Sequence, residues 1–334
     1  MKPVLSVLDP SPLFEGWDAA DAFAQTVALA EALDGSDWRA FWVQEHHNAA
    51  SFAGTAPEVL MAALAQRTQH LKIGSGGVML PNYSPLKVAE QFCALSALTP
   101  GRIELGLGRA TGSDPRTAAA LLGPGADSFP GMLRLLMDWM LDATGEVPLP
   151  ADHRARGIRV GPLGHRPDVW MLSSSTESAA FAGAMGLKLA YADFLAPGGG
   201  PAAIAAYRAS FQPSIFAAIP HAALGLVGLA ADTEADAHRL SRSSVAWNIT
   251  RAAGAFEPFP RMDTAAEQLA TASPEAITAA SSHGMVGEAD RVAGQLVSTA
   301  QAAAADEVFL LTITESLDAR IRSYELIARA MARL

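Results

Sequence analysis

Short apolar runs rich in β-branched residues alternate along the 334-residue chain with longer runs rich in alanine and leucine. The short runs predict strands and the long runs predict helices. Eight strands are expected, over residues 4–8, 41–44, 71–78, 103–108, 169–172, 187–192, 224–230 and 308–313. A helix should follow each strand, over residues 19–33, 57–68, 85–98, 130–142, 177–186, 202–211, 234–245 and 317–333. Strands that alternate with helices imply a parallel sheet, and eight such units favour a closed (β/α)8 TIM barrel of the α/β class over an open sheet.

Two segments interrupt this alternation. Residues 148–167 are punctuated by glycine and proline and predict a loop. Residues 247–283 form an insertion near the C-terminal third, between the seventh helix and the final helix, strand and helix. Such an insertion is either a lid or binding loop over the site, or a peripheral excursion. Because the chain has no sequence repeat and no long linker, we expect a single barrel domain over residues 1–334.

Charge and cysteine content narrow the functional classes. The formal net charge is −10 and lysine and arginine do not cluster, which argues against a nucleic-acid partner. The single cysteine, Cys93, rules out an internal disulfide and a cysteine-based metal cage. The sequence shows no apolar run of about 18 residues, as a membrane span needs, and no signal-peptide core. We therefore expect a cytoplasmic protein without a membrane partner.

The second predicted strand runs directly into Glu45, His46 and His47. In such a barrel the C-terminal strand ends face the active site, so these residues are candidates for proton transfer or hydrogen bonding. Adjacent side chains on an extended chain point to opposite sides, so only one histidine should enter the site. The other is expected to pack or to make a structural hydrogen bond. No metal site is predicted, because the H-E-x-x-H pattern is absent.

Glycine is frequent in the third predicted strand, where Gly76, Gly77 and Val78 follow Gly74 and Ser75. Glycine inside a strand marks either the close approach of a ligand or a bulge at the barrel rim. A flat ring lying on the strand would be such a ligand, and Gly76, Gly77 and Val78 are its candidate contacts.

Two further strand ends carry groups that bind anions. The fourth strand ends at Gly108 and Arg109, and arginine there can hold a phosphate through charge-assisted hydrogen bonds. The glycine spacing before Arg109 does not fit a dinucleotide-binding fingerprint. The fifth strand opens a helix through a hydroxyl run, formed by Ser173, Ser174, Ser175 and Thr176. Alone this run is typical of an ordinary N-cap, but together with Arg109 it favours a phosphate site.

Together these segments resemble the bacterial luciferase-like family of flavin-dependent monooxygenases. The matching stretches are FWVQEHH at residues 41–47, IGSGGVMLP at 73–81, VAEQ at 88–91 and GRIELGLGRATGSD at 101–114. The resemblance covers nearly the whole chain and is weakest over residues 247–283. It implies a luciferase-like barrel that holds reduced FMN at its mouth and uses O2 to oxygenate a small organic substrate.

The resemblance also implies roles for the residues of the first two motifs. His46 matches the catalytic histidine, and Glu45 and His47 match the residues that flank it in the substrate pocket. Gly76 and Gly77 match a dipeptide that is joined by a non-prolyl cis bond beneath the flavin ring.

The remaining motifs match the family's phosphate site and substrate pocket. Arg109 matches a phosphate-binding arginine, and the hydroxyl run from Ser173 to Thr176 matches the second phosphate contact. Gly108, in the substrate pocket, stands where luciferases proper carry a reactive cysteine. This departure argues against efficient light emission and against a substrate range restricted to aldehydes.

A separate flavin reductase is expected to supply the reduced FMN, since no nicotinamide-binding motif is evident, and a homodimer is expected. Two rival classes share the barrel. One is a dehydrogenase or reductase that uses flavin or reduced deazaflavin without oxygen chemistry. The other is a non-catalytic flavin-binding relative, against which His46 argues, because a pure binding protein needs no acid–base group. The sequence does not identify the organic substrate.

Overall fold

Eight parallel strands close into a barrel within residues 2–121 and 128–334, the part of the chain that the computed structural model describes. Around the barrel the order is β1-β2-β3-β4-β5-β6-β7-β9, and β9 pairs with β1 to close it. The prediction of a closed (β/α)8 TIM barrel is therefore confirmed. The strands are β1 (Val4–Asp9), β2 (Ala40–Val43), β3 (Lys72–Met79), β4 (Ile103–Gly108), β5 (Asp168–Ser173), β6 (Lys188–Ala192), β7 (Ala222–Ala231), β8 (Met285–Glu288) and β9 (Glu307–Leu311).

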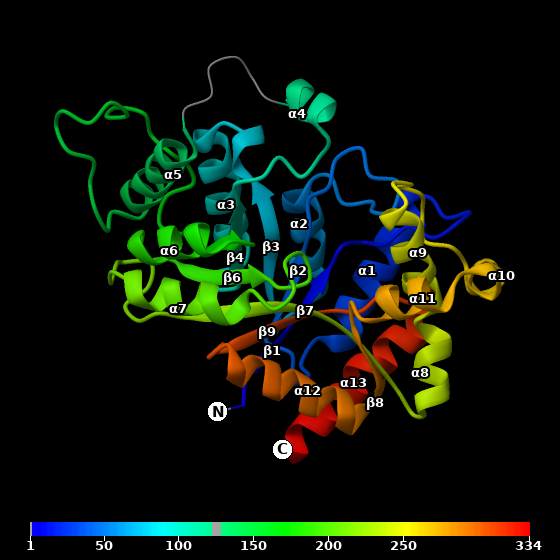
Figure 1. The fold of residues 1–334 in the computed structure, drawn as a ribbon. Helices are drawn as coiled ribbons and strands as arrows, with labels where there is room; N and C mark the ends of the chain where they lie inside the picture. Colours follow the sequence, from blue (N-terminus) through cyan, green and yellow to red (C-terminus); the bar gives the residue numbers. More distant parts are fainter. Residues whose placement is uncertain (1, 122–127) are drawn as a thin grey trace.

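Helices surround the barrel and cover its outer face (Figure 1). The helices that follow the first six strands are α1 (Ala19–Leu33), α2 (Pro57–Arg67), α3 (Pro85–Leu98), α4 (Pro115–Leu121), α5 (Phe129–Thr144), α6 (Thr176–Ala184) and α7 (Gly200–Ser210). The helices of the last third are α8 (Glu234–Leu240), α9 (Arg242–Ala252), α10 (Met262–Thr271), α11 (Pro274–Ser281), α12 (Ala289–Ala302) and α13 (Leu317–Arg333). A short 3-10 helix, η1 (Leu80–Asn82), follows β3. The predicted loop over residues 148–167 has no regular element.

Alternate residues of a strand pack on opposite sides of the barrel wall. Phe41 and Val43 of β2 join the core between the strands and the helices, whereas Trp42 points into the barrel. Inside the barrel, the Trp42 ring lies edge-on to Trp170, with 5.3 Å between ring centroids, and 4.0 Å from Phe309. These rings fill the middle of the barrel, so its interior is a packed core.

The N-terminal end of the barrel is closed by charged side chains that pair with one another. Arg39, just before β2, contacts Glu104 of β4 and Glu307 of β9, each with a shortest nitrogen–oxygen distance of 2.7 Å. Trp42 Nε1 donates to Glu104, and His221 Nε2 lies 2.9 Å from Glu307. Burial opposes ionisation of Glu307, but the hydrogen bond from His221 and the charge of Arg39 outweigh it, so the Glu307 pKa is lowered.

The last third of the chain departs from the sequence prediction. The helix expected over residues 234–245 is two helices, α8 and α9, which meet at Ser241. The predicted insertion over residues 247–283 therefore begins inside α9, and it contains α10 and α11. An unpredicted strand, β8, pairs with the C-terminal half of β7 beyond the closed barrel. Figure 1 shows α9, α10 and α11 gathered on one side of the barrel.

Candidate functional site

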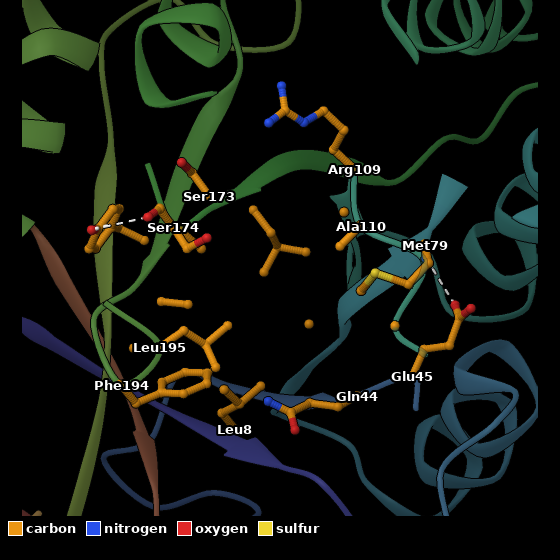
Figure 2. Close-up of a pocket in the computed structure, with 18 of the residues that line it drawn as sticks. Leu8, Gln44, Glu45, Met79, Arg109, Ala110, Ser173, Ser174, Phe194 and Leu195 are labelled. Atoms are coloured by element: carbon orange, nitrogen blue, oxygen red, sulfur yellow. Dashed lines mark hydrogen bonds between the residues drawn. The ribbon is translucent and has the colours of Figure 1, made fainter. Parts of the chain in front are cut away.

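A cavity of about 430 Å³ opens at the C-terminal ends of the barrel strands. Its floor is apolar and is formed by Leu8, Trp42 and Phe309 from three different strands. The rim carries the polar groups, because side chains at the strand ends and in the following loops turn towards the opening (Figure 2). The cavity therefore offers an apolar surface for a flat ring and polar contacts around its edge.

His46 lines this cavity and His47 does not. The period of two that places Trp42 inside the barrel continues past the end of β2, so Gln44 and His46 also line the cavity. His47 instead lies 2.8 Å from a buried oxygen of Glu45, through its Nε2 atom. The expectation that only one of the two histidines enters the site is thus confirmed, and the other makes a structural contact.

The Glu45 carboxylate ties the ends of β2 and β3 together. It accepts hydrogen bonds from the Met79 backbone N–H at 2.9 Å and from Asn82 Nδ2 at 3.1 Å, as well as contacting His47 (Figure 2). The Asn82 amide also donates to the Thr111 carbonyl at 3.0 Å. Glu45 lines the cavity, but these contacts occupy both of its carboxylate oxygens, so its geometry is that of a positioning group.

The His46 ring is held as a neutral imidazole. Its backbone N–H donates to the Gly54 carbonyl at 2.8 Å, and its ring packs on Phe52 with 4.6 Å between centroids. Burial, and then the proximity of His47, lower the pKa of His46 to about 4. The His46 Nδ1 atom is buried and has no hydrogen-bond partner within residues 2–121 and 128–334. Because the neutral His46 ring lines the cavity, it can exchange a hydrogen bond or a proton with a ligand there.

Two aromatic rings of the segment over residues 247–283 pack against Phe52. Phe52 lies 5.9 Å from Trp247 and 5.8 Å from Phe259, measured between ring centroids. Trp247 Nε1 donates to Ser51 Oγ at 2.9 Å, which fixes the loop that carries Phe52. None of this segment lines the cavity, and its contact with the site runs through Phe52, whose ring packs on His46.

Arg109 and the hydroxyl run come together at another part of the rim. Arg109 and the first three serines, Ser173, Ser174 and Ser175, all line the cavity, although more than 60 residues separate them in sequence. Figure 2 shows Arg109 and Ser173 on the same side of the opening. Arg109 is exposed and has no ion pair or side-chain hydrogen bond with any residue that the structure describes.

The start of helix α6 also lies at this part of the rim. Ser175 caps α6 by accepting from the Ser178 N–H, and Ser173 Oγ donates to the Ser175 carbonyl at 2.8 Å. Ser175 and Ser178 place the start of α6 at the cavity, where the positive end of the helix dipole favours a negative charge. The Ser178 N–H is bonded to Ser175, and the Glu177 N–H is bonded to its own carboxylate. Thr176, the first residue of α6, does not line the cavity. The donors around this part of the rim suit a phosphate or a carboxylate.

At Gly76 in β3 and Gly108 in β4, neighbouring side chains occupy the space that a Cβ atom would need. Gly76 lines the cavity, and a Cβ atom there would lie 2.7 Å from Leu8 Cδ1. The peptide bond between Gly76 and Gly77 is cis, as the sequence resemblance implied. A Cβ atom at Gly108 would meet Met79 Sδ at 2.6 Å. Gly77 and Val78 do not line the cavity, and the Val78 side chain joins the core on the outer side of the barrel.

A family model described as luciferase-like monooxygenase matches residues 5–307. The chain belongs to the luciferase-like monooxygenase family. It is 36% identical to a luciferase-like monooxygenase of Escherichia coli (strain K12), over 96% of this chain and 95% of the relative. It is 38% identical to the N-acetyl-S-alkylcysteine monooxygenase of Bacillus subtilis (strain 168), over 72% of each chain.

Solved structures share the barrel of this chain. The apo structure of MsnO8 superposes with a TM-score of 0.87 at 33% identity, covering 99% of this chain and 98% of that one. Two structures below 20% identity show the same fold with different cofactors. One is a type II Baeyer-Villiger monooxygenase component from Pseudomonas putida in complex with FMN, with a TM-score of 0.72 and coverage of 100% and 98%. The other is an F420-dependent secondary alcohol dehydrogenase, with a TM-score of 0.66 and coverage of 99% of each chain.

Several residues of the luciferase-like cavity are absent from the sequence prediction. Gln44 is one, and the period of two leading to His46 would have found it. Phe194 and Leu195 are others, and they come from the loop after β6, whose path no sequence period encodes. Among residues 2–121 and 128–334, no group of three or more His, Cys, Asp and Glu is placed to hold a metal. Over the same residues, every helix is too short or too polar to cross a bilayer.

Proposed function

We propose that this protein is a flavin-dependent monooxygenase that uses reduced FMN and O2 to oxygenate a small organic substrate. The observation that carries the proposal is the convergence of His46, Arg109 and the serines from Ser173 to Ser175 on one cavity. These groups come from β2, β4 and β5, and each stands at the C-terminal end of its strand. Membership of the luciferase-like family gives this cavity its chemical context.

The groups around the cavity fit FMN. The Arg109 guanidinium has no ion pair or hydrogen bond among the described residues, although its charge acts on the Glu177 carboxylate, and together with the N-terminus of α6 it would hold the phosphate. The apolar floor, with Leu8 and Trp42, would accept the flat ring, and Gly76 leaves room beside it. When bound, reduced FMN supplies the two electrons and two protons with which one oxygen atom of O2 becomes water while the other enters the substrate. Gly77, Val78 and Thr176, which do not line the cavity, contribute at most through the backbone in this proposal.

The chain itself controls water and protons at the site. The apolar floor excludes water, which would otherwise divert a reactive oxygen species to hydrogen peroxide. His46 is neutral at pH 7, because its pKa is about 4, and its ring lines the cavity, where it can hold a hydrogen bond to a reacting group. Glu45 and His47 keep the end of β2 in place, so that His46 faces the cavity.

We further propose the partners that this chemistry needs. A separate flavin reductase would deliver the reduced FMN, since no nicotinamide-binding motif is evident in the sequence. We also propose that the chain forms a single barrel domain and that it assembles as a homodimer. Residues 247–283 would hold the Phe52 ring against His46 through Trp247. The organic substrate to test first is an N-acetyl-S-alkylcysteine, because a relative at 38% identity is named for that activity.

Anaerobic titration separates the cofactor choices. The purified protein is titrated with reduced FMN and, in parallel, with a reduced deazaflavin, and is then mixed with ¹⁸O2 in the presence of N-acetyl-S-methylcysteine. We expect tighter binding of reduced FMN and one ¹⁸O atom in the product. Preferred binding of the deazaflavin, with hydride transfer and no oxygen incorporation, would replace the proposal with a dehydrogenase. Oxidation of NAD(P)H by the purified chain alone would point to a flavin reductase.

A further inference from the structure

Gln44 places a side-chain amide inside the apolar part of the cavity. It directly follows β2, and the period of two aims it into the barrel between Trp42 and His46. Its exposed fraction is 7%, and the apolar side chains of Leu8 and Phe194 line the same part of the cavity (Figure 2). The amide is therefore a polar group in a largely apolar, buried setting.

The Gln44 amide makes no hydrogen bond with any residue that the structure describes. Its neighbour in sequence, Glu45, is 1% exposed and is contacted by His47, Met79 and Asn82, so the local fold is able to satisfy a buried polar group. Most buried polar side chains in proteins are hydrogen-bonded, and one that is not is destabilising unless something else pairs with it. The Gln44 amide atoms are open to the cavity, so their partner is whatever fills it, water or a ligand.

We propose that Gln44 is a hydrogen-bonding anchor for a ligand edge that carries a carbonyl oxygen beside an N–H group. A side-chain amide offers both a donor and an acceptor, and the group that satisfies both is another amide or an imide. The cofactor source of this chemistry is the pyrimidine ring of the flavin, and this part of the inference rests on the proposed function. The substrate source is an amide such as that of an N-acetylated amino acid. Figure 2 shows Gln44 on the opposite side of the cavity from Arg109, so the two contacts would fix different parts of a ligand.

The test compares Gln44→Met with Gln91→Met. Methionine removes the amide with little change in shape, and Gln91 lies on the outer helix α3, where it donates to Glu58. Both variants and the wild type are titrated with oxidised FMN and with N3-methylated FMN, which lacks the imide N–H. We expect Gln44→Met to bind FMN roughly 3- to 10-fold more weakly and the control to bind normally. N3-methylated FMN should show a smaller difference between Gln44→Met and the wild type than FMN does, because the hydrogen bond from the imide N–H is already lost.

A second titration distinguishes the substrate source. The FMN-loaded proteins are titrated with N-acetyl-S-methylcysteine, and a loss confined to this arm assigns the anchor to the organic ligand. Gln44→Glu, which keeps an acceptor but loses the N–H donors, repeats both arms if the methionine variant does not fold. Ligand-free Gln44→Met should be about as stable as the wild type, because the amide makes no hydrogen bond with a described residue whose loss would weaken the fold.

The outcomes separate this inference from the proposed function. Wild-type protein that binds no flavin contradicts the proposed function. The role of Gln44 alone is contradicted if the wild type binds FMN and the Gln44 variants bind FMN with the same affinity. In that outcome the variants also bind N-acetyl-S-methylcysteine as the wild type does, or neither shows detectable binding. A thermal unfolding midpoint that falls in ligand-free Gln44→Met would also contradict it, since it would show that the amide serves the fold.

Discussion

At the N-terminal end of the barrel Arg39 is paired with Glu104 and Glu307, whereas at the C-terminal end Arg109 has no ion pair within the described residues. The same contrast holds for histidine. His221 at the N-terminal end contacts Glu307, but His46 at the other end leaves Nδ1 buried and unpartnered among those residues. Both ends use charged and polar side chains that project from strand ends. One end satisfies its polar groups within the chain, and we propose that the other end leaves Arg109 and His46 for a ligand.

The contrast predicts the largest effect for His46→Ala. A positioned acid–base group contributes about 10²- to 10⁴-fold to rate, so oxygenation should fall by that factor while reduced FMN still binds. Product yield per FMN oxidised, with the hydrogen peroxide released, measures the loss. His47→Ala is the matched control, and it should act through stability because His47 contacts Glu45 outside the cavity. Wild-type product yield in His46→Ala would remove that residue from the mechanism.

A mutation at the N-terminal end of the barrel should lower the free energy of unfolding and leave the affinity for reduced FMN unchanged. Arg39→Met leaves Glu104 and Glu307 buried without their cation, and breaking such a pair costs about 3–5 kcal/mol of unfolding free energy. Urea denaturation measures this loss, and the affinity for reduced FMN should stay close to that of the wild type. Arg67→Met, which removes an exposed ion pair with Glu31, should change little. A large loss of flavin affinity in folded Arg39→Met would contradict the view that the N-terminal end serves stability and the C-terminal end serves binding.

Arg109→Ala should weaken the binding of reduced FMN by about 10- to 100-fold, with little effect on stability. A charge-assisted hydrogen bond is worth about 1.5–3 kcal/mol, and Arg109 has no described partner whose loss would unfold the chain. Riboflavin lacks the phosphate, so its affinity should be the same in the wild type and in the variant. Arg116→Ala, at an exposed arginine outside the cavity, serves as the control. Equal loss of FMN and riboflavin affinity would show that Arg109 does not contact the phosphate.

A smaller and more specific effect is expected from Phe52→Ala, which uncovers the His46 ring. The pKa of His46, about 4, should move upward towards its ordinary value of 6.5. In the wild type the unfolded chain binds a proton at His46 below pH 6.5 and the folded chain does not until about pH 4. The contribution to stability is therefore complete above pH 6.5 and is lost as the pH falls towards 4.

The His46 titration can be followed by NMR of the imidazole in both proteins. The variant should lose less stability between pH 6.5 and pH 4 than the wild type, since its folded and unfolded pKa values lie closer together. An unchanged His46 pKa in Phe52→Ala would show that Phe52 does not shield the ring.

The barrel and much of the cavity could be predicted from the sequence because strands repeat every two residues and strand ends meet at one edge. The same rule that brings His46 to the cavity also brings Gln44, which the motif-based prediction omitted. Val78 shows the converse, because its position beside Gly76 and Gly77 suggested a cofactor contact while its side chain packs outside the barrel. Sequence motifs thus locate a strand end, and the alternation of side chains along the strand decides which of them face the cavity.

The parts that could not be predicted depend on loops and on short elements. Phe52 reaches His46 from an irregular loop, and Phe194 enters the cavity from the loop after β6, so neither has a periodic signal. β8 is only four residues long, and its strand character depends on pairing with β7. The break between α8 and α9 occurs at Ser241 without glycine or proline to mark it. Tertiary packing determines all of these features.

Hydrogen exchange with and without reduced FMN, under anaerobic conditions, tests the difference between the two ends most directly. Backbone N–H groups that a ligand covers or orders exchange more slowly. We predict slower exchange on FMN binding at residues 108–112 and 173–178, around Arg109 and the start of α6, and unchanged exchange at the N-terminal strand ends near Arg39 and Glu307. No protection at residues 108–112 and 173–178, or protection confined to the N-terminal end of the barrel, would contradict the account.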